Sequence, residues 1–274
     1  MPRLNKGTEA TRDFYDQVGW KRQDGILNDV RMFNWQEGPI HRQLEILRRD
    51  RVLHLIESGS WLVELGCGGT PSAYLADKCS KFTGVDFSVV GLAEAANALK
   101  KTGVEFELVE SDITSLPFED NKFDVAYSKH VIAHIDTVVG QIAMLSEAMR
   151  VVKPGGLLIL ITGNPFPLLF PYRLTRRLLA ITPGLNWLLN KLRTKPPLPS
   201  KPMTLGWMKR QLEKCGEVTI TGFEVPNWEF DRLVPAETTR VGSLVWRFIL
   251  WLERYHPKSA TRLGCNVLIL VKKK

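Results

Sequence analysis

The sequence predicts an α/β fold in which helices cover a mostly parallel sheet, and three observations support this expectation. Short apolar runs alternate with helical stretches from residue 60 onward, which is typical of parallel sheets. The first run ends in a turn with three glycines, Gly66, Gly68 and Gly69. The second run ends in Asp86, at about the 20-residue spacing that nucleotide-binding folds use for an acid.

The glycine turn is the most informative segment of the chain. It follows the apolar run Trp61–Leu65, which carries one acid, Glu64. Glycines at this place let a ligand lie against bare backbone. We expect Thr70 and Pro71 to open a helix as N-cap and first helical residue, because proline has no N–H to leave unpaired there. Together with Asp86, the turn implies a ribose-bearing cofactor.

Further apolar runs predict the remaining strands. They are Lys81–Val85, Val104–Val109, a run that ends at Ser128, Leu157–Ile161, Val218–Val225 and Asn266–Val271. Helices are expected between them. The clearest are Ile40–Ile56, a stretch that ends at Arg150, Met203–Lys214 and Val241–Tyr255.

With these elements in order, residues 60–162 resemble a class I S-adenosylmethionine-dependent methyltransferase. The pattern is most similar to the ubiquinone and menaquinone biosynthesis methyltransferases. The resemblance implies a Rossmann-like fold with a seven-stranded, mostly parallel sheet, an antiparallel last strand and helices on both faces. It also implies S-adenosyl-L-methionine as the cofactor. Thr70 departs from the family, which usually has glycine there, and its expected capping role offers a reason.

The resemblance further implies a set of cofactor contacts. The residues are Tyr15, Glu64, Gly66, Cys67, Gly68, Asp86, Phe87, Asp112, Ile113 and Ser128. Glu64 would lie under the methionine end of the cofactor, and the backbone of the glycine turn would approach its ribose and carboxylate. Asp86 would accept hydrogen bonds from the ribose hydroxyls. Phe87 would pack on the adenine face, and Asp112 would accept from the adenine amino group.

Two histidines after the fourth strand are candidate catalytic residues. His130 and His134 are four residues apart, so they share a face if that segment is helical. Histidine titrates near neutrality and can take a proton from a hydroxyl or carbon acid. We expect His130 to be the base or a substrate contact and His134 to be structural. No metal site is expected, because the pair lacks further close ligands.

The chain is expected to divide at residue 60. Residues 1–59 are predicted to form an N-terminal helical cap or lid, and residues 60–274 the methyltransferase domain with inserted substrate-cap segments at 163–202 and 226–262. In the first insert, the cluster Arg173, Arg176 and Arg177 beside leucines suits a helix on a membrane surface. A helix that simply caps the domain explains the same pattern. Val241–Tyr255 is apolar almost all round, which indicates burial on two sides or contact with lipid or an apolar substrate.

Composition is compatible with this interpretation. The 37 Lys and Arg against 29 Asp and Glu give a formal net charge of +8, which suits an anionic partner without selecting one. The four cysteines lack metal or disulfide spacing and indicate reduced thiols. The N-terminus lacks the apolar core of a signal peptide. A cytoplasmic protein is expected, with peripheral association at the membrane inner surface as a further expectation.

Three functions remain open. The first is methyl transfer to oxygen or carbon of a lipophilic small molecule, such as a quinone, isoprenoid, pigment or natural product. The second is a tRNA- or RNA-modifying methyltransferase. The added segments are apolar rather than basic with interleaved aromatics, so nucleic acid is the less favoured partner. The third is a non-catalytic S-adenosylmethionine-binding protein. The acceptor, the atom methylated and the oligomeric state are left open.

Overall fold

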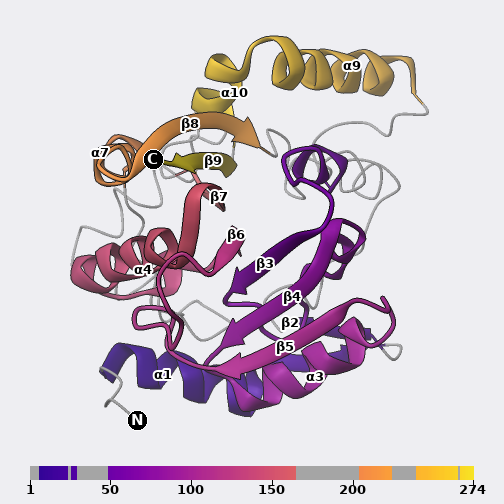
Figure 1. Ribbon diagram of the computed structural model, residues 1–274. Coiled ribbons are helices and arrows are strands. Elements are labelled where there is room, and N and C mark those ends of the chain that lie inside the picture. Colours follow the sequence, from indigo (N-terminus) through magenta and orange to yellow (C-terminus); the bar gives the residue numbers. More distant parts are fainter. Residues whose placement is uncertain (1–5, 24–25, 30–48, 165–203, 224–238, 265) are drawn as a thin grey trace, which may run out of the picture.

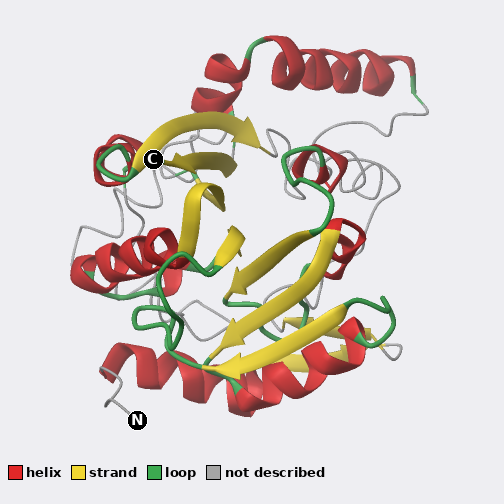
Figure 2. Ribbon diagram, viewed as in Figure 1, coloured by secondary structure: helices red, strands yellow, loops and turns green. Residues whose placement is uncertain are grey.

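A single seven-stranded sheet forms the centre of the molecule (Figures 1 and 2). The computed structural model describes residues 6–23, 26–29, 49–164, 204–223, 239–264 and 266–274. The strands are β3 (Ser60–Leu65), β4 (Cys79–Asp86), β5 (Glu105–Glu110), β6 (Phe123–Lys129), β7 (Val152–Gly163), β8 (Gly216–Phe223) and β9 (Asn266–Lys273). Each predicted apolar run therefore lies in a strand, with ends that differ by a few residues.

The strand order is β5-β4-β3-β6-β7-β9-β8. Strands β3 to β7 pair in parallel, whereas β9 runs antiparallel to both β7 and β8. This confirms the predicted mostly parallel sheet with an antiparallel last strand. The chain builds β3, β4 and β5 outward and then returns to β6 on the other side of β3. In open α/β sheets, ligands bind at the carboxyl ends of the strands beside such a reversal.

Helices follow the strands in the expected order. They are the 3₁₀ helix η2 (Ala73–Lys78), α3 (Val89–Leu99), the short 3₁₀ helix η3 (Ile132–His134), α4 (Val138–Val151), α7 (Leu205–Leu212), α9 (Arg240–Tyr255) and α10 (Pro257–Leu263). Four of them begin with a hydroxyl N-cap that accepts a backbone N–H three residues on. These N-caps are Ser88, Thr137, Thr204 and Thr239. Such caps satisfy one of the unpaired donors of a helix start.

The predicted helix start at Thr70 and Pro71 is wrong. The helix that follows the glycine turn is a short 3₁₀ helix that begins at Ala73, with Ser72 before it. The cause is a contact inside the turn, because Glu64 accepts hydrogen bonds from both the backbone N and the Oγ of Ser72 at 2.8 Å. These bonds hold Ser72 outside the helix. Only six residues then remain before β4 begins at Cys79.

Alternate residues of the strands build two apolar cores, one on each face of the sheet. On one face, Val63 and Leu65 of β3 pack with side chains of α4 and α7. On the other, Leu62 packs with residues of the segment before β3, among them Val52. Residues 49–53 are helical, which is the described part of the helix predicted at Ile40–Ile56. The two cores are separate because successive side chains along a strand point to opposite faces of the sheet.

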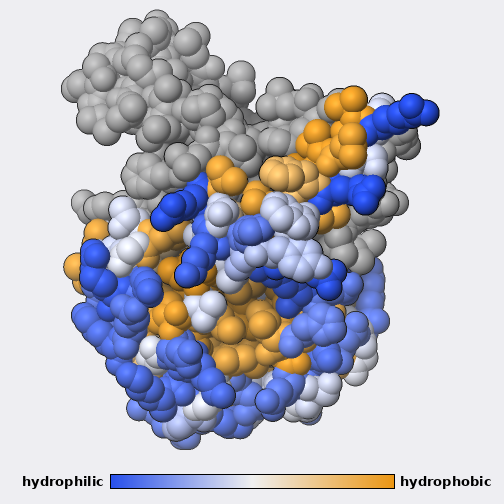
Figure 3. Space-filling view, turned by 90° about the horizontal axis from the view of Figure 1, so that it is seen from above, coloured by the Kyte–Doolittle hydropathy of each residue, from blue (hydrophilic) through white to orange (hydrophobic). Residues whose placement is uncertain are grey.

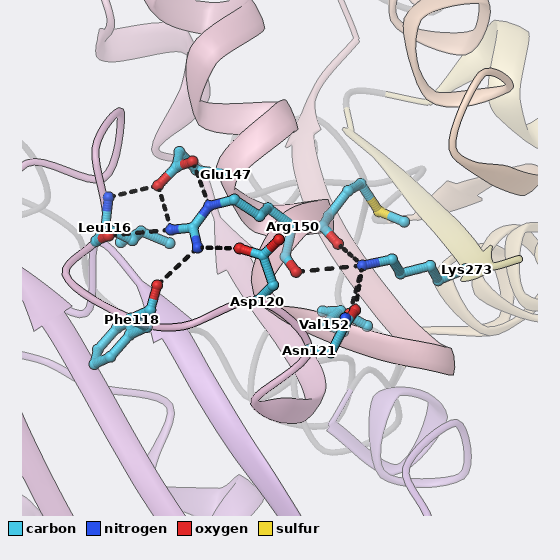
Figure 4. A network of polar contacts seen from close by, with 9 residues as sticks. Leu116, Phe118, Asp120, Asn121, Glu147, Arg150, Val152 and Lys273 are labelled. Carbon is cyan, nitrogen blue, oxygen red and sulfur yellow. Dashed lines mark hydrogen bonds and ion pairs between the residues drawn. The ribbon is translucent and has the colours of Figure 1, made fainter.

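A polar network fastens the last strand to α4 (Figure 4). Lys273 Nζ donates to the carbonyl oxygens of Met149 and Val152 at 2.7 Å and to Asn121 Oδ1 at 2.9 Å. Arg150 binds Glu147 and Asp120 and reaches two loop carbonyls. The lysine satisfies carbonyls that the end of a helix leaves without partners.

The N-terminal segment lies beside the glycine turn. It contains α1 (Lys6–Phe14), the π-helical turn η1 (Tyr15–Gly19), and an antiparallel pair, β1 (Trp20–Gln23) and β2 (Ile26–Asp29). The strand pair was not predicted. Among the residues that the structure describes, no helix has both the length and the apolarity needed to cross a bilayer.

Candidate functional site

The glycine turn lies where the order of the parallel strands reverses. Gly66 and Gly68 have φ values of 75° and 52°, a region that disfavours other residues. Gly66 N and Cys67 N both donate to the carbonyl oxygen of Val85 on β4. A Cβ on Gly66 would lie 2.5 Å from Val131. The glycines are therefore required by the backbone path and by close packing.

Asp86 ends β4 and faces the turn. Its Oδ2 accepts from Gly68 N at 2.8 Å, and its Oδ1 accepts from Ser88 N at 2.9 Å. The side chain is buried. Burial, aided by the charge of Asp16, raises the pKa of Asp86 to about 6, although the backbone N–H groups oppose the shift. The carboxylate is thus held in one orientation at the place where sequence reasoning put it.

Glu64 lies below the turn and is also buried. Desolvation raises its pKa to about 7, despite the two hydrogen bonds from Ser72. Asp86 contributes to this shift because two negative charges oppose each other. A positive charge close to the two carboxyl groups would lower the pKa of both Glu64 and Asp86. The two buried carboxyl groups would therefore be stabilised in their charged forms by a positive charge beside them.

The N-terminal segment adds two residues that sequence reasoning missed, Asp16 and Trp20. Asp16 Oδ1 accepts from Ser88 Oγ at 2.6 Å. The Trp20 ring lies so close to Gly68 that a Cβ on that glycine would be 2.8 Å from it. The predicted Tyr15 packs against Trp20, with ring centroids 5.4 Å apart. The Phe-Tyr-Asp sequence contained Asp16, but nothing local showed that it reaches Ser88, 72 residues further along the chain.

The other predicted cofactor residues surround the same strand ends. Asp112 follows β5, and its Oδ1 accepts from both the N and the Oγ1 of Thr114 at 2.8 Å. Ile113 is buried in the core, and Phe87 is half-buried. The Ser128 hydroxyl donates to the Leu65 carbonyl at 2.9 Å. That bond fastens β6 to β3.

The segment with the two histidines is not the continuous helix that would put them on one face. His130 adopts φ 61°, and its N donates to the Ile161 carbonyl at 2.8 Å. Only Ile132–His134 forms a single 3₁₀ turn. Both side chains are half-buried, and they follow β6 at the ligand end of the sheet. No group of three metal-binding side chains occurs in the described part of the chain.

This arrangement fits S-adenosyl-L-methionine. Its sulfonium and amino groups are positively charged, and two buried acids with raised pKa values lie beneath the glycine turn. Asp86 would offer a fixed carboxylate to ribose hydroxyls. The glycines of the turn add no side chains of their own, and the Trp20 ring lies against Gly68. The strand order, the glycine turn and Asp86 thus define a Rossmann-like fold of the class I methyltransferase type.

Comparison with known proteins supports this classification. Residues 63–160 match the family described as Methyltransferase domain. A 24-methylenesterol C-methyltransferase 2 from Oryza sativa subsp. japonica is 30% identical over 49% of this chain and 40% of its own length. A demethylmenaquinone methyltransferase from Beutenbergia cavernae is 33% identical over 58% of this chain and 61% of its own length. The chain thus spans between about two fifths and three fifths of these two relatives.

Solved structures of proteins with little sequence identity to this chain share its fold. The geranyl diphosphate C-methyltransferase from Streptomyces coelicolor A3(2) superimposes with a TM-score of 0.61 over 100% of both chains, at 15% identity. Residues 63–160 therefore form a methyltransferase domain, and the chain has the fold of class I S-adenosylmethionine-dependent methyltransferases. The predicted family, fold class and cofactor are confirmed.

Proposed function

We propose that the protein transfers a methyl group from S-adenosyl-L-methionine to oxygen or carbon of a lipophilic small molecule. The buried Asp86 carboxylate, fixed by Gly68 and Ser88 at the end of β4, carries the cofactor part of this proposal. The acceptor part is supported by relatives whose names describe sterol and menaquinone-precursor methylation. Quinones, isoprenoids, pigments and related natural products are the acceptors that fit.

An apolar rim beside the histidines supports a lipophilic acceptor. Val138, Val139 and Ile142 are exposed at the start of α4. They follow His134 in the chain, at the ligand end of the sheet. Burial of these side chains against a hydrocarbon acceptor would contribute about 25 cal/mol per Å² of apolar surface.

The chain supplies orientation and proton removal. The bound cofactor supplies an activated methyl group. Asp86 and the glycine turn would hold the ribose, Glu64 would stabilise the positive end, and His130 would accept the acceptor's proton. Asp112, Phe87, Ile113 and the Ser128 backbone would surround the adenine and methionine parts. Tyr15, which packs against Trp20, would contact the cofactor, and His134 would have a structural role.

The setting of the reaction is part of the proposal. We expect a cytoplasmic enzyme that meets its acceptor at a membrane surface. The predicted arginine cluster of the first insert, Arg173, Arg176 and Arg177, lies outside the described residues, so it stays a prediction, as does the assignment of residues 163–202 and 226–262 to substrate caps. RNA is the alternative acceptor, supported by the resemblance of the core to RNA-modifying methyltransferases and by the net charge of +8.

The test is a transfer experiment with methyl-labelled cofactor. Purified protein is incubated with the label and either total lipid extract or total RNA from the same cells. Label in the organic phase, identified by mass spectrometry, is the expected result. Label in RNA alone would replace the lipophilic acceptor by the RNA-modifying function. Cofactor binding by calorimetry without transfer to either fraction would favour the non-catalytic alternative.

A further inference from the structure

Helix α9 carries a row of apolar side chains exposed along one face. Val241, Leu244, Phe248, Trp251 and Tyr255 are each between 45% and 66% exposed. Their spacing of three or four residues places all five on one side of the helix. We call this row the α9 stripe. Contiguous exposed apolar surface of this kind marks an interaction site rather than an ordinary solvent-facing helix.

The α9 stripe is not needed to hold the helix on the domain. The opposite face already does so, because Trp246, Ile249 and Leu252 are buried and the latter two pack against Ala260 of α10. The helix has one acid, Glu253. It lies 4.0 Å from Arg51 with its side chain only 14% exposed. The outward surface of α9 therefore contains no negative charge.

Three exposed arginines accompany the α9 stripe. Arg240, Arg247 and Arg254 are separated by seven residues each, which is close to two turns of an α-helix. They therefore form a row along one edge of the stripe. In the view from above, hydrophobic residues gather over α9 with hydrophilic residues beside them (Figure 3). The surface therefore combines a row of exposed apolar side chains with a row of positive charges along one of its edges.

The position of α9 separates the stripe from the cofactor site. In Figure 1, α9 lies at the top of the molecule, whereas the carboxyl ends of β3, β4 and β5 lie near its lower part. The stripe therefore lies away from the glycine turn. Its occupant must be something that meets the outside of the protein.

We propose that the α9 stripe and its three arginines dock the protein on a membrane with anionic headgroups. The helix lies parallel to the bilayer plane, its apolar side chains enter the acyl boundary, and the arginines contact lipid phosphates. Phe248, Trp251 and Tyr255 suit the headgroup level, where aromatic side chains concentrate. The row of cations without an acid selects an anionic lipid surface over an apolar protein partner. The inference deepens the membrane setting of the proposed function by naming the surface that docks, and it does not depend on methyl transfer.

The test measures sedimentation of the full chain with vesicles of phosphatidylglycerol and phosphatidylcholine, and with phosphatidylcholine alone. Binding only to the anionic vesicles, weakened by salt, is the expected result. The triple variant Arg240→Gln, Arg247→Gln, Arg254→Gln should bind about fivefold more weakly for each arginine lost, or on the order of a hundredfold in total. The double variant Phe248→Ser, Trp251→Ser should lose binding to the same vesicles while keeping its charge.

A matched control separates a specific surface from general charge. The variant Lys100→Gln, Lys101→Gln, Arg210→Gln removes the same charge from exposed residues just after α3 and on α7. It should bind vesicles as the wild type does. Equal loss in this control, equal binding to neutral vesicles, or no binding at all would each overturn the proposal. A dimer that dissociates in the Phe248→Ser, Trp251→Ser variant would overturn it in favour of self-association.

The outcome is independent of the proposed function. Calorimetric titration with S-adenosyl-L-methionine should give unchanged affinity in all three variants, because α9 lies away from the glycine turn. Circular dichroism checks that each variant is folded. Wild-type protein that binds vesicles but not the cofactor would defeat the proposed function and leave the docking surface intact.

Discussion

Asp86 shows how much of a site can be expected from local sequence. Its place after the second strand indicated a carboxylate at a ligand-binding strand end, and the structure places it there with both oxygens engaged. Asp16 and Trp20 could not be found in this way, because they meet the site only through folding of a distant segment. A residue at the end of a predicted strand can be placed from the sequence. A residue that reaches the site from a distant segment can be placed only when the tertiary structure is known.

Replacing Asp86 tests cofactor recognition. Asp86→Asn should weaken S-adenosyl-L-methionine binding by about 1–3 kcal/mol, because an uncharged amide is a poorer acceptor for ribose hydroxyls. In the wild type, affinity should fall as the pH drops through about 6, because protonation removes the charged acceptor. Isothermal calorimetry between pH 5 and pH 8 measures both effects.

The nearby Glu64, with a pKa of about 7, also titrates in this range, so Glu64→Gln is the control. It should retain the change in affinity near pH 6. Equal affinity of Asp86→Asn and wild type across the range would remove Asp86 from the site.

His130 is the candidate base, and its backbone limits the choice of variant. With φ at 61°, asparagine is suitable because it tolerates the left-handed region better than most residues. His130→Asn should lower turnover by roughly 10²–10⁴-fold with nearly unchanged cofactor affinity. Initial rates of label transfer and calorimetry measure the two quantities. His134→Gln should instead affect mainly stability, and normal turnover in His130→Asn would exclude the base.

At the scale of elements, apolar runs located the strands because a buried parallel strand is apolar on both faces. The 3₁₀ helix η2 and the strand pair β1–β2 are among the elements that were not foreseen. The 3₁₀ helix η2 replaced the expected helix start because Glu64 holds Ser72, a contact that propensity does not report. The strand pair β1–β2 did have a local signal, the Asp24-Gly25 sequence between its strands, which favours two-residue hairpins.

The Lys273 network provides a test of how elements are joined. Lys273→Met keeps the aliphatic length but leaves the carbonyls of Met149 and Val152 without this donor. The free energy of unfolding should fall by about 1–3 kcal/mol, measured by urea denaturation. The adjacent Lys272 is exposed, so Lys272→Met is the matched control and should change stability little. Equal losses in both variants would show that the network contributes no specific stability.

At the scale of the whole molecule, the strand order followed from resemblance rather than from periodicity. Apolar runs identify strands but not their neighbours, and the insertion of β9 between β7 and β8 has no signature in either strand. The identity of the acceptor was not predictable for a related reason. An acceptor site is built from segments that are distant in the sequence, and their spatial positions are set only after folding.

The position of β9 also has a consequence for how the protein is made. Strand β8 is synthesised before β9, yet β9 is its neighbour in the sheet and separates it from β7. Residues 164–273 must therefore leave the ribosome before the sheet closes, which takes roughly 5 to 20 seconds at ordinary rates of synthesis. During that time β7 presents an open edge, the kind of surface that pairs with other chains. Nascent protein is thus exposed to misassembly until its final strand emerges, and chaperone supply should limit its yield more than the stability of the finished fold does.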